Sequence, residues 1–395
     1  MALPNQRVYF AIQGVAIKPD AQTTWGTDDV VHGVQSVAVT TTFNLEQAFE
    51  LGQLEIYENI EGVPDIEVSL SKVLDGFPPA YVMATSQASS PTLGGRSVPK
   101  CVVGLGIWDD SADNIGTQNP VSQMEASGMF VGSVTYNFPL EDNFSEDVTL
   151  VGNDKVWTEG QTCELGEGVW NTGYLAIPDG MNRNADTPYA ADSGNPASLG
   201  GINRRENMLF LTEAAANTSG AVDYTMLPNE IPGVTGGAAA TNGVKTSAAK
   251  IQSITVSTDF AREEIFELGT RQPYARVVTF PVEVTTDIEV LSASGDLINA
   301  LSDGCGGTTG CEGVQDNLSN QEIRITACEG LRVYMGSKNK LASVNYGGGD
   351  AGGGNVTVTY SYTTFNDFSV MHPTDPSTQW LWQDRDESGW LGYTQ

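Results

Sequence analysis

The chain has 395 residues, of which 40% are hydrophobic and 17% charged, as expected for a folded protein of two or three ordinary domains. Its 49 acidic and 19 basic side chains give a formal net charge of −30, which argues against nucleic-acid binding through phosphates, because that needs Lys and Arg. Two interpretations of the charge remain open, a salt-adapted or very soluble surface and a surface that repels DNA. No stretch of 18 apolar residues occurs, so we expect no membrane-spanning helix.

The first predicted element is a strand over residues 8–17. The sequence before it lacks the basic and apolar regions of a signal peptide, so we expect none. The next strand covers residues 34–43, where side chains of one face alternate with polar neighbours. These side chains are Val37, Val39, Thr41 and Phe43.

A short helix is predicted at residues 44–51. Leu45, Ala48 and Phe49 are spaced for one helical face, and Gly52 follows as a stop signal. Period-two alternation then returns, which predicts further strands. These strands cover residues 66–70 and 134–138.

An internal repeat determines the organisation of the chain. VQSVAVTTTFNLEQAFELG (34–52) and IQSITVSTDFAREEIFELG (251–269) are identical at ten of nineteen positions without a gap. We therefore predict a tandem duplication. The match continues farther along the chain. After one extra residue, Asp65, IEVS (66–69) pairs with VEVT (282–285). VTYNF (134–138) then pairs with VTYSY (358–362), residues 143–145 with 367–369, and Trp157 with Trp380.

The predicted fold class is mainly β, with two tandem antiparallel β-barrel or sandwich domains that each carry a short α-helix. The acidity belongs to both parts, since residues 1–157 hold 20 acidic and 6 basic side chains, a net of −14, which leaves −16 for the remainder. The predicted units are a first domain (1–157), a connecting segment (158–203), a second domain (204–380) with an enlarged loop (213–249), and an aromatic C-terminal arm (381–395).

No residue pattern predicts catalysis, a cofactor or a metal site. The two histidines, His32 and His372, have no metal-ligand spacing and are interpreted as ordinary loop residues. The sequence DDSADN (109–114) resembles a calcium loop only loosely, because it lacks the glycine and the closing glutamate. The five cysteines form no CxxC pair and are expected to be reduced, although Cys305 and Cys311 could close a small loop.

The segment VHGVQSVAVTTTFNLEQAFELGQLEIYENIEGVPDIEVSLSKVLDG (31–76) resembles the tail tube (major tail) proteins of tailed bacteriophages, and residues 251–290 are similar to related virion proteins. The resemblance implies a β-barrel or sandwich fold with one helix, in which six domains close a ring around a channel and rings stack into a tube. Two such domains per chain imply rings of three chains with pseudo-sixfold symmetry. It also implies a structural, non-enzymatic protein of the virion tail, assembled in the host cytoplasm.

The partners implied by the resemblance are other copies of the chain, a tape-measure protein, a tail terminator, distal-tail or baseplate proteins, and genomic DNA that passes without specific binding. Aromatic side chains are enriched at interfaces, so those of the C-terminal segment from residue 380 onward are the candidate interface residues. They are Trp380, Trp382, Trp390 and Tyr393. Two other hypotheses are a secreted or surface β-sandwich adhesin that binds carbohydrate and a polysaccharide-degrading enzyme with a carboxylate pair in one copy.

Overall fold

The structure is a computed structural model and describes two large parts of the chain with gaps between them. The described residues are 5–111, 115, 119–160, 163–166, 169–170, 202–208, 210, 225–228, 231, 234–235, 244–245, 250–292, 295–296, 298, 320–327, 331–347 and 354–372. The candidate interface residues of the C-terminal arm and Cys305, Cys311 and Cys328 lie outside them.

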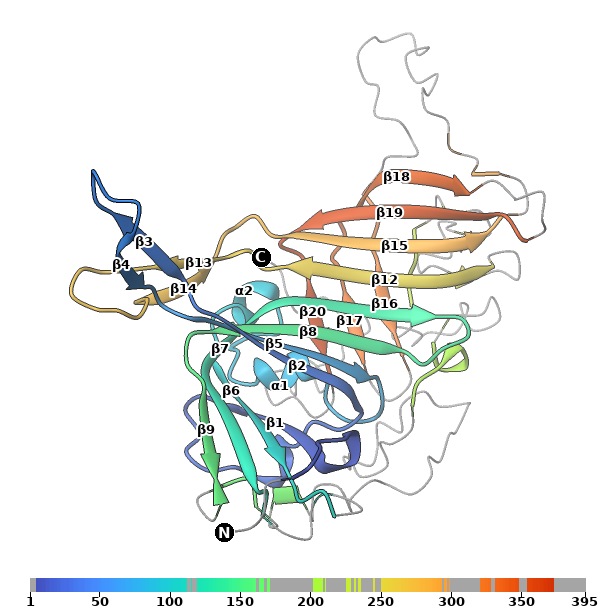
Figure 1. Cartoon of the computed structure of the whole chain (residues 1–395). Helices are drawn as coiled ribbons and strands as arrows, with labels where there is room; N and C mark the ends of the chain where they lie inside the picture. The colour runs from blue at the N-terminus through green and yellow to red at the C-terminus, as the bar shows by residue number, and fades with distance from the viewer. Residues whose placement is uncertain are drawn as a thin grey trace.

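The dominant feature is one eleven-stranded sheet in which every pair of neighbours is antiparallel (Figure 1). Eight strands follow one another in the order β18-β19-β15-β12-β7-β8-β5-β2, and three more branch from β7. The prediction of a mainly β, antiparallel fold is therefore confirmed. The eight are β2 (Val34–Thr42), β5 (Asp65–Val73), β7 (Ser122–Pro139), β8 (Ser145–Gly152), β12 (Ile251–Asp259), β15 (Glu283–Leu291), β18 (Lys340–Gly347) and β19 (Thr357–Phe365), and the branch holds β1 (Gln13–Pro19), β6 (Cys101–Ile107) and β9 (Val156–Glu159).

The eight strands divide into two sets of four with the same order. In the first repeat β2 pairs with β5, β5 with β8 and β8 with β7, and in the second repeat β12 pairs with β15, β15 with β19 and β19 with β18. Even the β-bulges correspond, since the register shifts at Val34/Ser36 as at Ile251/Ser253, and at Val131/Ser133 as at Leu341/Ser343. Both parts of the chain therefore build one four-stranded arrangement, while the predicted domain boundaries stay predictions.

The strand pairing corrects the later matches of the sequence alignment. Ile66 lies opposite Thr41 and Val284 opposite Thr258, so residue 66 corresponds to residue 284 instead of 282. VTYNF lies in β7 and VTYSY in β19, whose counterpart is β8. Residue alternation with a period of two looks alike after a shift of two residues or a change of strand, which explains these errors.

The predicted helix at residues 44–51 is also wrong. This segment forms the strand β3 (Leu45–Phe49), which pairs with β4 (Ile56–Glu61) in a hairpin. The corresponding hairpin of the second repeat is β13 (Arg262–Ile265) with β14 (Ala275–Val278). The short helices are instead α1 (Ala80–Ala84) and α2 (Leu93–Arg96) of the first repeat, and the described part of the second repeat contains no α-helix.

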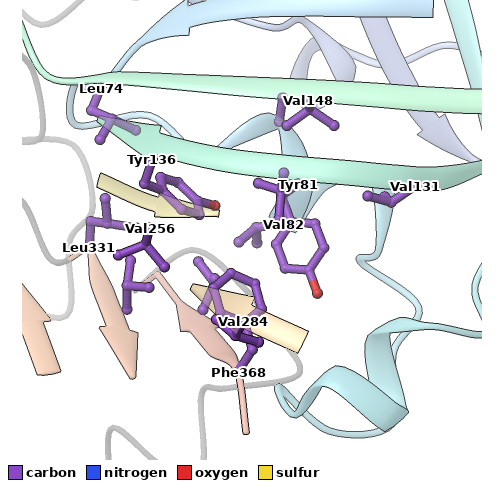
Figure 2. Packing of buried hydrophobic residues seen from close by; sticks show 14 of the residues in the cluster. Leu74, Tyr81, Val82, Val131, Tyr136, Val148, Val256, Val284, Leu331 and Phe368 are labelled. Carbon is purple, nitrogen blue, oxygen red and sulfur yellow. The ribbon is translucent and has the colours of Figure 1, made fainter. Parts of the chain in front are cut away.

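One face of the sheet packs against a second layer that contains α1 and a small sheet of β16 (Arg324–Thr326), β17 (Arg332–Tyr334) and β20 (Ser369–Met371). The core between them is one cluster that includes both repeats. Figure 2 shows Tyr81 and Tyr136 of the first repeat close to Val256 and Val284 of the second. A smaller cluster lies behind β1 and β6, where the rings of Trp108 and Trp170 meet edge to face at 5.1 Å.

The remaining described elements are short. They are the 3-10 helices η1 (Phe10–Ile12), η2 (Thr27–Asp29) and η5 (Arg205–Asn207) and the strand pair β10 (Val234–Thr235) and β11 (Val244–Lys245). No helix in the described parts is long and apolar enough to cross a membrane.

Candidate assembly surfaces

The two repeats meet within the chain along the contact between β7 and β12, which we call the internal seam. Seven residue pairs run from Ser253 opposite Pro139 to Asp259 opposite Ser133. Just beyond the last pair, the backbone N–H of Phe260 donates to the carbonyl of Gly132 at 2.8 Å. The Phe260 side chain is fully buried. The repeats are thus joined by sheet hydrogen bonds and by a shared apolar core.

The outer ends of the eight-stranded path are β2 and β18, and within the described residues no further strand pairs with either of them. Edge strands present unpaired N–H and C=O groups and are sites for pairing with another chain. These two strands are also the repeat counterparts of the two strands that form the internal seam, since β2 corresponds to β12 and β18 to β7. The two outer strands, β18 and β2, are therefore equivalent to the two strands, β7 and β12, that already pair with each other inside the chain.

Each repeat projects a β-hairpin, which we call the first arm (residues 45–61) and the second arm (residues 262–278). Both arms extend from the same end of the sheet and lie beside each other (Figure 1). They have equal registers, and Gly52 and Gly269 take the same positive φ of 96° at the two turns, a conformation that glycine adopts without strain.

The arms carry many exposed large apolar side chains, more than isolated surface residues would explain. Leu51 and Leu268, which correspond in the repeat, are both fully exposed at the tips. The other large apolar side chains exposed on the arms or at their bases are Phe43, Leu45, Phe49, Leu54, Ile56, Tyr57, Ile60, Ile265, Phe266, Tyr274, Val277 and Phe280. Such projecting surface is typical of a contact with another molecule.

Arginines of the second arm fix it to the first repeat. The Arg276 guanidinium donates to Asp65 at 3.1 Å and to the side-chain oxygen of Asn153 at 3.2 Å, and it also pairs with Glu264 of its own arm. Nearer the tip, Arg271 donates to the Gly62 carbonyl at 3.1 Å. These contacts orient the second arm relative to the first.

A third arginine, Arg262, lies at the base of the second arm. Its guanidinium donates to the carbonyls of Val131 at 2.5 Å and Ser97 at 2.9 Å and lies 4.7 Å from the centre of the Phe130 ring. Burial lowers the pKa of Arg262 to about 10, so it still carries its charge at neutral pH. A buried, charged arginine therefore links the two repeats at the end of the internal seam that lies next to the arms.

The sheet face opposite the core is lined by small polar and acidic side chains. Along each of the eight strands, residues that alternate with buried core positions are partly or fully exposed. Most of them are Ser or Thr, and Lys340 is the single basic residue among them in these eight strands. The acidic ones are Asp65, Glu67, Glu125, Asp147, Asp259, Glu283, Asp287 and Glu289.

A buried carboxylate of the first repeat, that of Glu146, is hydrogen-bonded to the elements around it. Glu146 is fully buried, and its carboxylate accepts hydrogen bonds from the backbone N–H groups of Ala80 at 2.6 Å and Tyr81 at 3.1 Å and from the Tyr136 hydroxyl at 2.7 Å. Burial raises the pKa of Glu146, while these hydrogen bonds and nearby Lys72 oppose the rise. The group holds α1 against the sheet.

The histidines predicted as ordinary loop residues are both buried. His32 stacks on Phe77 with ring centres 3.8 Å apart, and burial lowers the pKa of His32 to about 4 and of His372 to about 3. The described residues hold no group of three or more His, Cys, Asp and Glu side chains placed to bind a metal, and Cys101 and Cys163 are free thiols. Within the loop 109–114, the described Asp109 accepts hydrogen bonds from Ser111 alone.

Sequence reasoning missed the arms and the internal seam. The signal for the arms was present, because the first repeat contains Phe49, Leu51, Leu54 and Ile56 in a segment too short and too irregular to bury them. The seam has no sequence signal of its own, since β7 and β12 show the same alternation as strands that pair within one repeat.

No family model matches the chain, and no curated protein sequence matches it. Among solved structures, it is similar to a chain of the sheath–tube complex of an extracellular contractile injection system (12% identity, TM-score 0.30, 40% of this chain and 95% of the other). It is also similar to a chain of the tube-terminating cap of the anti-feeding prophage (15%, 0.29, 40% and 100%) and to an Hcp protein (8%, 0.22, 38% and 98%).

Proposed function

We propose that the chain is a structural subunit that joins copies of itself edge to edge into a ring, and that rings stack into a tube, as in the tail tube of a tailed phage. The observation that carries this proposal is the internal seam. It pairs β7 with β12, and the free edges β18 and β2 are the repeat counterparts of the same two strands. A head-to-tail contact that repeats with a fixed rotation closes into a ring and leaves no open sheet edge.

The ring contains three chains in this proposal, so that six repeats are arranged with pseudo-sixfold symmetry. Within each chain the internal seam joins one repeat to the next, and between chains the β18 and β2 edges make the corresponding contact. Half of the joints are therefore built into the chain itself. A ring of six repeats then has three joints between molecules in place of six.

The polar and acidic face of the sheet lines the channel in the proposed tube. The core face packs against α1 and the small sheet, so it points to the outside of the ring. The conduit carries genomic DNA from the head to the host, and the wall does not bind it. The tape-measure protein, tail terminator and distal-tail or baseplate proteins are the proposed partners at the inside and the ends of the tube.

Contacts between rings use the tips of the arms in this proposal. Leu51 and Leu268 are placed at equivalent, fully exposed positions in the two arms, so all six arms of a ring present the same apolar surface. The aromatic residues Trp380, Trp382 and Trp390 of the C-terminal arm add a second set of anchors between subunits or rings.

Electron microscopy of the purified protein in negative stain tests the proposal directly. We expect rings or stacked tubes, and class averages of three chains per ring with six similar lobes. A protein that stays monomeric at high concentration contradicts the proposal. A monomer that binds carbohydrates on a glycan array supports the adhesin hypothesis in its place.

A further inference from the structure

We infer that the joint between neighbouring chains follows the internal seam strand by strand, with neutral and apolar side chains where the internal seam has arginines. This inference rests on the proposed assembly into rings. It names the surface that each chain offers to the next, and the occupant of that surface is a second copy of this chain.

The register follows from the repeat. Strand β2 corresponds to β12 with an offset of 217 residues, since the bulge at Val34/Ser36 matches that at Ile251/Ser253. Strand β18 corresponds to β7 with an offset of 210, since the bulge at Leu341/Ser343 matches that at Val131/Ser133. The internal pairing therefore translates into a pairing between chains. Val256 opposite Tyr136 becomes Val39 opposite Tyr346, and Thr258 opposite Val134 becomes Thr41 opposite Val344.

At the position that the pairing between chains would cover, the phenylalanine of the second repeat is buried and that of the first repeat is exposed. Phe260 is 0% exposed because the internal seam covers it, whereas its counterpart Phe43 is 70% exposed at the free edge. The Phe260 N–H donates to the Gly132 carbonyl at 2.8 Å, and the corresponding acceptor for Phe43 is the Ala342 carbonyl of the neighbouring chain. Two phenylalanines in one repeat position, one buried and one exposed, indicate that the exposed one is covered in the assembly.

The charged contacts of the internal seam have no counterpart between chains. Arg262, Arg271 and Arg276 of the second arm correspond to Leu45, Leu54 and Asn59 of the first arm, whose hairpin has the same register. The surface that meets them changes in the same way. Asp65 corresponds to Glu283, and Asn153, which accepts a hydrogen bond from Arg276, corresponds to Phe365.

These replacements leave an exposed apolar surface where the next chain docks. Phe365, the last residue of β19, and Phe280, just before β15, are both more than half exposed. The first arm of the neighbouring chain brings Leu45 and Asn59 onto this surface. The ring then contains two kinds of joint, an arginine-closed joint inside each chain and an apolar joint between chains.

An apolar joint between chains is compatible with the high negative charge of each chain, as the effect of salt makes clear. Chains of charge −30 repel one another, and a joint between them that used ion pairs would weaken with salt. Salt screens the repulsion but does not weaken an apolar joint. We therefore expect ring formation to stay equal or to rise when sodium chloride is raised from about 0.05 M to about 0.5 M. A tenfold fall in assembled protein over this range would overturn the apolar assignment.

A cross-linking experiment on the full chain tests the geometry. In the variant Asn59→Cys with Phe365→Cys, a short bis-maleimide should link neighbouring chains and give dimers and trimers in a denaturing gel, with no larger species. The matched control is Asn59→Cys with Thr359→Cys, because residue 359 lies on the same face of β19 but six residues, about 20 Å, away. The native chain and the single-cysteine variants correct for native thiols.

The outcomes separate the inference from the proposed function. A ladder for the 59/365 pair that is absent for the 59/359 pair supports the inference. Rings in the microscope without a 59/365 ladder, or with equal ladders for both pairs, overturn the inference and leave the tube proposal standing. Neither rings nor a ladder from the native and variant chains would overturn both.

Discussion

Truncation of Phe260 should destabilise the isolated chain, whereas truncation of its repeat counterpart Phe43 should leave its stability almost unchanged. Phe260 is fully buried, its ring lies 6.1 Å from that of Tyr81, and it adjoins the Arg262 guanidinium at 5.8 Å. Removal of such a side chain costs about 3–5 kcal/mol from the lost transfer free energy and the cavity that remains. At about 1.4 kcal/mol per factor of ten, Phe260→Ala lowers the folding equilibrium constant roughly a hundredfold or more.

Phe43→Ala is the matched control, because the same atoms are removed from a side chain that is 70% exposed. Surface substitutions usually change stability by less than about 0.5 kcal/mol. Urea unfolding of dilute, unassembled protein, followed by far-ultraviolet circular dichroism, should therefore show a lower midpoint for Phe260→Ala only. Ring formation should fail for Phe43→Ala, since the neighbouring chain then loses a buried contact. Equal midpoints for the two variants would refute the assignment of Phe260 to a buried internal seam.

Three further predictions concern pH, the arm tips and the C-terminus. Burial lowers the pKa of His32 to about 4 and that of His372 to about 3, whereas both histidines titrate near 6.5 in the unfolded chain. Unfolding therefore takes up protons, and the stability of the fold decreases as the pH drops from about 6.5 towards 4. The variant His372→Gln should weaken this dependence of the urea midpoint on pH. Leu51→Ser with Leu268→Ser should leave stability within about 0.5 kcal/mol but yield single rings in place of tubes in the microscope. Deletion of residues 379–395 should impair stacking without unfolding the chain, and unchanged tubes from that truncation would contradict an interface role for its tryptophans.

The repeat and the strands could be predicted because they are local patterns. Val37, Val39 and Thr41 alternate with polar residues, and the match between 34–52 and 251–269 needs no structural knowledge. The helix prediction failed because Leu45 and Phe49 satisfy a helical spacing equally well over so short a segment. The partner that decides the matter is β4, which the local pattern does not reveal.

The assembly surfaces were less accessible to sequence reasoning because they depend on what covers a residue. Phe43 and Phe260 are the same amino acid in the same repeat position, yet one is exposed and the other buried. The difference arises from β7, which lies over a hundred residues from Phe260 and pairs with β12. Only a structure shows that the chain joins its own repeats in the manner proposed for its neighbours.

The acidic face of the sheet leads to a prediction about DNA passage. The face carries eight carboxylates and Lys340 on its eight strands, and Arg276 pairs with one of these carboxylates, that of Asp65. Duplex DNA carries about one negative charge per 1.7 Å of its axis, so a wall of this composition repels it. Screening limits the repulsion to about 8–10 Å at physiological ionic strength, which keeps DNA off the wall without closing the channel.

Replacement of two carboxylates of this face by Lys separates this role from general solubility. We expect tubes of the native chain to retain no duplex DNA. Tubes of Asp147→Lys with Asp287→Lys should retain more duplex DNA at low salt than native tubes, because the two substitutions cut the net charge of the face from −7 to −3 per chain, counting its eight carboxylates and Lys340. The difference should shrink as salt rises, because salt screens the remaining repulsion. Replacement of Glu141 and Asp142 by Lys is the control, since both are exposed in the turn between β7 and β8, neither lies in a strand of this sheet, and the net charge changes equally. If the control tubes retain DNA as strongly, or if native tubes bind it, the acidity serves solubility and the wall has no lubricating role.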